Sequence, residues 1–303
     1  MLAVFLGGGC NKNQISKTIT YDNDYAGIKT AIGDEDSIEA SSLHQSTADI
    51  VEAVFIDHRQ FANTATVPAK EINGYPVAGV VNHHTLAMDL QARFFRSLKV
   101  ARPDIKTFII ISPDHFLAGA EVSTHAFSYA TQAGNITSRA LLMDGVYEAR
   151  SVNIFAKEHG VGALAPFIAR EFPEAQIIPV FIRPEAGKEV LIMTAYSIKQ
   201  LSDEDAFIII SSDMSHYLTD KQARINDLTT LNWMQSKNWQ KLGLANDDYT
   251  DSKHGFTVLG QLFTEMSIEP QFFLLDYAAS TDYGADKNET TSYINGYYTI
   301  SNN

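Results

Sequence analysis

Cysteine is nearly absent from this chain of 303 residues, which contains Cys10 and no other. One cysteine excludes an internal disulfide and also excludes a zinc site built on CxxC pairs. Any metal held within the chain must therefore be bound through nitrogen and oxygen atoms, the donors that histidine and carboxylate side chains provide.

Basic residues are also scarce, since 23 Lys and Arg stand against 36 Asp and Glu, giving a net charge of −13 at pH 7. Nucleic-acid binding needs a basic surface that neutralises phosphates, and the few Lys/Arg pairs here do not extend into one. The composition therefore argues against a nucleic-acid partner. Hydrophobic residues make up 45% of the chain, which is enough to bury a large core.

No stretch of 18 apolar residues is present, so no segment predicts a membrane-spanning helix. The N-terminal MLAVFLGGGC nevertheless resembles a bacterial lipoprotein signal, with Cys10 as the lipidated residue and a polar tether after it. It lacks a basic region and its apolar run is short, so a cytoplasmic N-terminal arm is the alternative. We accordingly expect a tether or lipoprotein signal at 1–50 and a single α/β domain at 51–303.

Apolar runs of β type alternate with helical patterns from residue 67 onward. Strands are expected at 77–82, 107–112, 176–182, 206–212, 271–279 and 291–300, and helices at 86–98, 154–171, 187–201, 220–242 and 256–267. Residues 116–150 are expected to be irregular, with alternating pieces such as AEVSTHAFSYAT. Strands separated by helices of about 10–20 residues predict a three-layer α/β fold, a doubly wound and mostly parallel sheet with helices on both faces.

Three of the predicted strands end in segments that carry histidine. His83 and His84 follow the first strand, His115 follows the second, and Asp213 and His216 follow the strand at 206–212. Ligands of open α/β sheets bind beyond the carboxyl ends of the strands, so these side chains are expected to converge. A lone histidine at a strand end is more often structural. Several at equivalent strand ends predict a metal or catalytic site.

Each of the two carboxylates near these histidines can have one of two roles. Asp213 either caps the turn after its strand or orients His216. Asp251 either caps the helix expected at 256–267 or completes two histidines into a 2-His-1-carboxylate set, which suits non-haem Fe(II). Spacing alone does not choose between these roles. The remaining histidines interpreted as solvated or structural are His44, His58 and His125.

Six segments occur in the order and spacing of the Memo family: VVNHHTLAMDL, IIISPDHF, EHGVGALAPF, IIISSDMSHY, DSKHGFTVLGQLFTEM and the closing LLDYAASTD to TSYINGYYT. This resemblance covers about residues 75–300, and SSDMSHY and the EH…PF segment are its most specific pieces. The bacterial form of the family is protein B of the AmmeMemoRadiSam system, which implies radical-SAM and AMMECR-type partners. The family is similar in fold to class III extradiol ring-cleavage dioxygenases, and its members are associated with iron or copper.

The resemblance implies a ligand set for a divalent metal. The family's two histidine ligands fall on His83 and His115, and its cysteine ligand falls on Asp251. A carboxylate in place of a soft thiolate favours Fe(II) over copper(I), with Zn and Mn also open. Two other residues are alternative ligands. His84 is one, because the residues around His83 depart from the family motif, and His254 is the other, because it follows Asp251 closely.

The same alignment implies catalytic residues: His216, positioned by Asp213, exchanges a proton with a bound ligand, and His159 lines the pocket. The family's EHS-x-E-x-x-LPF is EHGVGALAPF here, so the pocket wall differs and no substrate can be carried over. The expected function is metal-dependent, O2-linked oxidation of an unknown small molecule. The alternatives are a metal- or peptide-binding module without turnover and metal-assisted hydrolysis.

Overall fold

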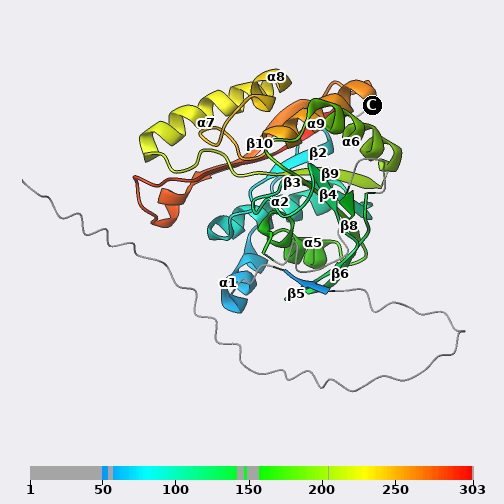
Figure 1. The fold of residues 1–303 in the computed structure, drawn as a ribbon. Coiled ribbons are helices and arrows are strands. Elements are labelled where there is room, and N and C mark those ends of the chain that lie inside the picture. The colour runs from blue at the N-terminus through cyan, green and yellow to red at the C-terminus, as the bar shows by residue number, and fades with distance from the viewer. Residues whose placement is uncertain (1–49, 54–56, 142–146, 149–156, 204, 302–303) are drawn as a thin grey trace, which may run out of the picture. The chain divides into compact units, whose positions relative to one another are not determined.

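The computed structural model describes residues 50–53, 57–141, 147–148, 157–203 and 205–301 (Figure 1). Cys10 and His44 lie outside these residues, as does nearly all of the predicted tether, so the tether and the domain boundary at residue 51 stay predictions. Among the described residues, no helix is both long enough and apolar enough to cross a membrane.

A mixed sheet organises the described part of the chain, with strand order β1-β5-β6-β8-β3-β9-β2-β11-β10, β4 pairing β8 and β7 pairing β4. The strands are β1 (Ile50–Glu52), β2 (Tyr75–Val81), β3 (Thr107–Pro113), β4 (Val122–Thr124), β5 (Ser128–Thr131), β6 (Gly134–Ser138), β7 (Tyr147–Glu148), β8 (Gln176–Ile182), β9 (Ala206–Ser211), β10 (Gln271–Ala279) and β11 (Ser292–Ile300). The central strands β6, β8, β3, β9 and β2 run parallel to one another. β11 and β10 add an antiparallel pair beside β2.

The helices between these strands are α1 (His58–Asn63), α2 (Met88–Ala101), α4 (His159–Gly162), α5 (Ala165–Glu171), α6 (Lys188–Leu201), α7 (Asp220–Gln235), α8 (Trp239–Gly243) and α9 (Lys253–Glu265). Three short 3-10 turns accompany them, η1 (Thr64–Thr66), η2 (Thr85–Ala87) and η3 (Ser280–Tyr283). In Figure 1, α6 and α9 lie on the side of the sheet opposite to α2 and α5.

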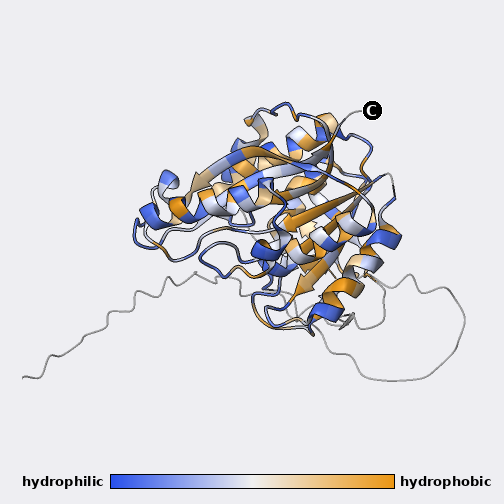
Figure 2. Cartoon of the chain, turned by 90° about the horizontal axis from the view of Figure 1, so that it is seen from above, coloured by the Kyte–Doolittle hydropathy of each residue, from blue (hydrophilic) through white to orange (hydrophobic). Residues whose placement is uncertain are grey.

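Two hydrophobic cores hold the sheet between its helices. Successive side chains of a strand point to opposite faces. In β3, Phe108 and Ile110 join the core formed with α2 and α5, whereas Ile109 and Ile111 join the core formed with α6 and α9. All four side chains are fully buried. Figure 2 shows the apolar strands enclosed by helices with hydrophilic outer surfaces. The predicted three-layer, mostly parallel α/β fold is confirmed.

Two of the predicted helices are each divided in the structure. The helix expected at 154–171 is present as α4 and α5, because Pro166 in the first turn of α5 starts a new helix and has no N–H to donate backwards. Residues 154–156 lie outside the described residues. The helix expected at 220–242 is present as α7 and α8, separated where Lys237 takes a left-handed φ of 55°.

The irregular segment expected at 116–150 was predicted wrongly, since β4, β5 and β6 lie within it. These strands are short and largely polar, so they carry no long apolar run, and only their pairing with β8 and β1 reveals them. His125 follows β4 and is buried. Its Nε2 lies 2.9 Å from the Tyr129 hydroxyl, and burial lowers the pKa of His125 to about 3. It is structural, whereas His58 at the start of α1 is exposed.

Gly160 allows α4 to approach the end of β3. A Cβ atom on Gly160 would lie 1.9 Å from Oγ of Ser112, so a larger residue must displace the side chain of Ser112. We expect Gly160→Ala to lower the free energy of unfolding by about 1–3 kcal/mol, in spite of the better helix propensity of alanine. Urea unfolding measures this. The loss should be smaller in a Ser112→Ala background, and an equal loss in both backgrounds would refute the contact.

Candidate metal centre

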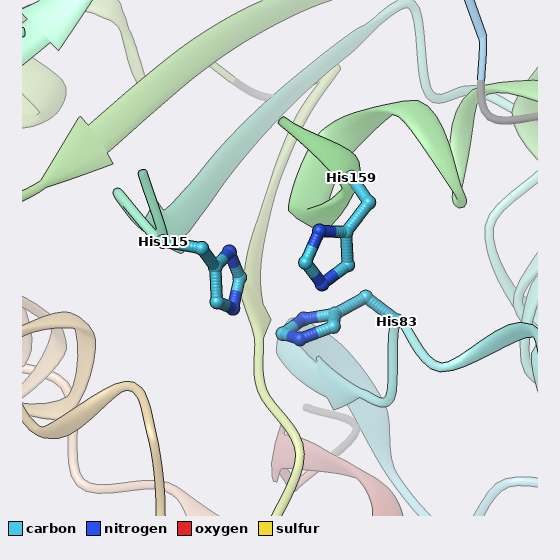
Figure 3. Close-up of side chains that lie close together, drawn as sticks. All are labelled: His83, His115 and His159. Carbon is cyan, nitrogen blue, oxygen red and sulfur yellow. The ribbon is translucent and has the colours of Figure 1, made fainter. Parts of the chain in front are cut away.

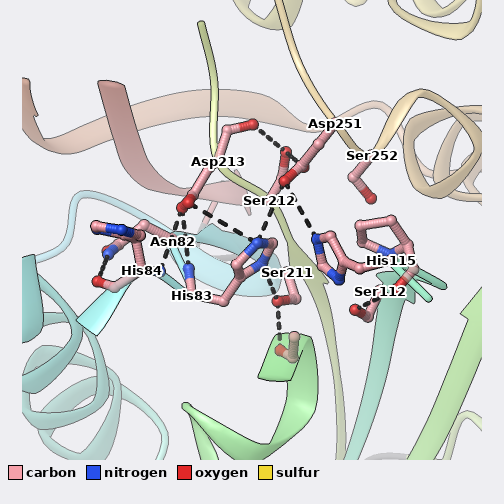
Figure 4. Close-up of polar contacts among 12 residues, drawn as sticks. Asn82, His83, His84, Ser112, His115, Ser211, Ser212, Asp213, Asp251 and Ser252 are labelled. Carbon is pink, nitrogen blue, oxygen red and sulfur yellow. Dashed lines mark hydrogen bonds and ion pairs between the residues drawn. The ribbon is translucent and has the colours of Figure 1, made fainter. Parts of the chain in front are cut away.

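The carboxyl ends of β2, β3 and β9 meet at one edge of the sheet, because β9 is the parallel neighbour of both other strands. Val81 of β2 is paired with Ser211 of β9, so the residues after these two positions lie at the same level. The strand-end argument predicts this arrangement. Figure 4 shows His83 and His115 brought to this edge, together with the segment that begins at Asp213.

Asp251 reaches the same edge from the loop before α9. Its backbone N–H donates to the carbonyl of Asp213 (3.3 Å), and its Oδ1 accepts a hydrogen bond from the Ser212 hydroxyl (3.0 Å). The residue before α9 is Ser252, so Asp251 does not cap that helix. The second oxygen, Oδ2, is buried and has no hydrogen-bond partner among the described residues.

Three imidazole rings surround this unpartnered oxygen. The distances to Oδ2 of Asp251 are 3.2 Å from Nε2 of His83, 3.7 Å from Nε2 of His115 and 3.9 Å from Nε2 of His216. One carboxylate oxygen and three ring nitrogens thus face one small volume. The four side chains come from three strand ends and one loop that are far apart in the sequence.

The other ring nitrogen of each histidine has an acceptor within hydrogen-bond distance: Ser211 Oγ for His83 (2.9 Å), Glu158 Oε1 for His115 (2.7 Å) and the Met214 carbonyl for His216 (2.7 Å). The Ser211 hydroxyl itself donates to the carbonyl of Gly160, so it can only accept from His83. In all three rings, therefore, Nδ1 carries the proton. When such a ring is neutral, its lone pair is on Nε2, the nitrogen that faces Asp251 in all three rings.

This set of donors fits a divalent cation. Neutral imidazole and carboxylate are the ligands that Fe(II), Mn(II) and Zn(II) take in proteins. Histidines bound to a metal usually donate their second N–H to a carboxylate or a carbonyl, which is the arrangement of His115 with Glu158. A buried carboxylate oxygen without a donor also requires a nearby positive charge. His83, His115 and Asp251 would hold the ion, with His216 beside it.

The charges at the centre also favour a cation. Burial alone would raise the pKa of Asp251, but His83 and His115 hold it well below its usual range. Burial opposes protonation of His115, but Asp251 and Glu158 outweigh this and raise its pKa to about 10. The carboxylates therefore attract either a proton on His115 or a metal ion. Metal binding here would release that proton.

Neither alternate ligand faces the centre. His84 is exposed, with Nδ1 2.9 Å from the Tyr293 hydroxyl and its ring stacked on Tyr293 at 5.9 Å between centroids. His254 directs Nε2 to the backbone carbonyl of Pro184 at 2.8 Å. The structure therefore brings His83, rather than His84, to the edge, and it brings Asp251 there rather than His254.

Asp213 lies in the centre but does not position His216, which corrects the prediction. Its Oδ1 accepts the backbone N–H of His83 (3.1 Å) and of His84 (3.4 Å), and its Oδ2 lies 3.8 Å from Nε2 of His83. No hydrogen bond or ion pair joins Asp213 to the ring of His216 in the described part of the chain. Because β9 and β2 are neighbours, the side chain of Asp213 reaches the turn after β2 and fixes its backbone.

His159, expected on the pocket wall, lies against the proposed ligands. Its ring is stacked on His115 (4.2 Å between centroids, 26° between planes) and edge-on to His83 (5.1 Å), as Figure 3 shows. One ligand atom from each of these three histidines lies within 4.8 Å of the others, and the same holds for His83, Asp213 and Asp251. Burial, and then the neighbouring imidazoles, lower the pKa of His159 to about 4.

Two residues that orient the ligands were not identified from the sequence. Glu158 is buried, and its Oε2 accepts the backbone N–H of His115 (2.9 Å) while its Oε1 holds the ring. Ser211, the last residue of β9, fixes the ring of His83. Their positions in the sequence could have identified them. Glu158 is an acidic residue directly before a helix that starts with histidine, and Ser211 is a hydroxyl residue at the end of an otherwise apolar strand.

Fold and site together define an α/β protein with a histidine–carboxylate centre at the carboxyl edge of its sheet. The profile of the Memo-like protein family matches residues 80–297, and the chain belongs to this family. The matched range contains every residue of the centre.

Individual relatives are distant. A MEMO1 family protein of Metallosphaera sedula is 25% identical over 231 residues, which cover 73% of this chain and 78% of the relative. One of Aquifex aeolicus is 25% identical over 197 residues, covering 61% and 73%. Among solved structures, an uncharacterized protein from Escherichia coli K12 overlaps with a TM-score of 0.44 and 12% identity, over 72% of this chain and 98% of that chain.

The two adjacent histidines give a direct test of the geometry. His83→Ala removes a ring whose Nε2 faces Asp251, so we expect most of the bound metal to be lost. His84→Ala removes a ring that faces Tyr293, so metal content should match the parent. Elemental analysis of the purified variants measures both. The reverse pattern would mean that the turn after β2 presents its side chains one residue out of register.

Glu158→Gln tests the carboxylate behind His115. Glutamine keeps the size of the side chain but removes the charge that orients the ring, so we expect metal affinity to fall by about 10–100-fold. Glu189→Gln, an exposed change on α6, is the matched control. Anaerobic Fe(II) titration compares the two. If Glu158→Gln binds as tightly as the control, the hydrogen bond to His115 has no part in holding the metal.

Proposed function

We propose that the protein is a mononuclear metal-dependent oxidoreductase that acts on a small molecule together with O2. Fe(II) would be held by His83, His115 and Asp251. The observation that supports this most is the convergence of imidazole Nε2 atoms on the buried, unpartnered Oδ2 of Asp251. Two histidines and one carboxylate leave further positions on the ion free for substrate and oxygen.

The bound metal would supply Lewis acidity and electrons for oxygen chemistry. The protein contributes orientation: Ser211 and Glu158 fix the rings of His83 and His115, so that only Nε2 of each can bind. The ring of His115 is 22% exposed, so a ligand can reach this side of the centre from solvent.

His216 is the residue proposed to move a proton. Its Nδ1 is fixed by the carbonyl of Met214, and its Nε2 lies 3.9 Å from Oδ2 of Asp251. A neutral ring in this tautomer can accept a proton at Nε2 from a ligand bound beside Asp251 and return it later. The ring is 16% exposed, so it is partly shielded from bulk water.

Nitric oxide, which binds Fe(II) where O2 would, tests this proposal. The protein loaded anaerobically with Fe(II) should form an iron–nitrosyl complex with its characteristic EPR signal, and Asp251→Ala should lose both the iron and the signal. Iron that binds but does not react with nitric oxide would contradict the oxidoreductase and favour a binding module. If the Fe(II)-loaded protein gives no nitrosyl signal and the Zn(II)-loaded protein hydrolyses an ester, metal-assisted hydrolysis would be favoured instead.

A further inference from the structure

His159 differs from the other histidines of the centre because its ring has no anchor. The rings of His83, His115 and His216 each have an acceptor for Nδ1 at 2.7–2.9 Å. The ring of His159 makes no hydrogen bond among the described residues, and Oε1 of Glu158 lies 4.0 Å from its Nδ1. Its side chain is 35% exposed, against 2% for His83. This imidazole is held by ring contacts with neighbours such as His83 and His115, so it can turn without breaking a hydrogen bond.

The position of this ring is nevertheless suited to metal binding. One nitrogen from each of His83, His115 and His159 lies within 4.8 Å of the others. Ligands at about 2.1 Å from a tetrahedral ion have nitrogens about 3.4 Å apart. The three nitrogens are therefore within about 1.4 Å of the required separation. Rotation of the unanchored His159 ring can move its nitrogen toward the other two while their rings keep their hydrogen bonds.

We propose that His159 is an alternative third ligand, which gives the centre two modes of binding. His83 and His115 hold the ion in both modes, and either Asp251 or His159 completes the set. This inference rests on the metal site of the proposed function. Two ions cannot bind together, because both modes need the single lone pair on Nε2 of His83 and of His115. One ion binds at a time.

The identity of the ion selects the mode. Carboxylate oxygen suits Mn(II), whereas imidazole suits Cu(II). Mn(II) should therefore take Asp251 as third ligand, and Cu(II) should take His159. The ring of His216 adjoins Asp251 and is not part of the three-histidine set. In the second mode the third ligand is therefore His159, rather than the carboxylate that adjoins the residue proposed to transfer protons.

The test is a titration of the full-length protein and two variants with Mn(II) and with Cu(II), followed by EPR. His159→Ala should bind Mn(II) within about twofold of the parent but bind Cu(II) at least about tenfold more weakly. Asp251→Ala should show the opposite pattern. Nitrogen couplings in the Cu(II) spectrum should fall from three to two in His159→Ala. His254→Ala, which removes a histidine whose Nε2 is directed at the carbonyl of Pro184, is the control and should change neither affinity.

The outcomes separate this inference from the proposed function. If the parent binds neither ion, or if His83→Ala binds both as tightly as the parent, the metal site itself is refuted. If the parent binds Mn(II) through Asp251 but His159→Ala keeps its full Cu(II) affinity and all three nitrogen couplings, the alternative ligand alone is refuted. Equal losses of both ions in His159→Ala would also overturn the two modes, since His159 would then act on the centre as a whole.

Discussion

The buried carboxylate of Asp251 is the group on which the metal centre depends. An ionised carboxylate is costly to bury unless donors or a cation compensate it. Only Oδ1 has a donor, the hydroxyl of Ser212, while Oδ2 faces the Nε2 atoms of three histidines that hold their protons on Nδ1. A divalent ion among these atoms would supply the missing charge. The surrounding hydrogen bonds keep the ring nitrogens directed at Asp251.

The strand order of the sheet brings the side chains of the centre together. β9 lies between β3 and β2, so three strand ends that are remote in sequence become neighbours, and the two cores hold the sheet rigid from both faces. Gly160 lets α4 approach the end of β3, and this close approach allows Glu158 to bind the ring of His115. Packing in the core therefore determines how well the ligands are oriented.

The sequence predicted the layers of the fold and the meeting of strand ends, because β3 and β9 are long apolar runs whose last residues must lie at one edge. The position of Asp251 came from family resemblance, since a loop before a helix carries no such pattern. The contact of Asp213 with the turn at His83 could not be foreseen, because it depends on which strands are neighbours. The role of Glu158 and the pairing of the short polar strands within 116–150 also depend on which elements are neighbours, so the sequence did not predict them.

X-ray absorption at the metal edge, on protein carrying one equivalent of Fe(II), tests the central claim most directly. The account predicts nitrogen and oxygen ligands at about 2.0–2.2 Å, with the outer-shell scattering of two imidazoles, and loss of most of the iron in Asp251→Ala. Iron bound without imidazole scattering, or iron retained in full by Asp251→Ala, would contradict it.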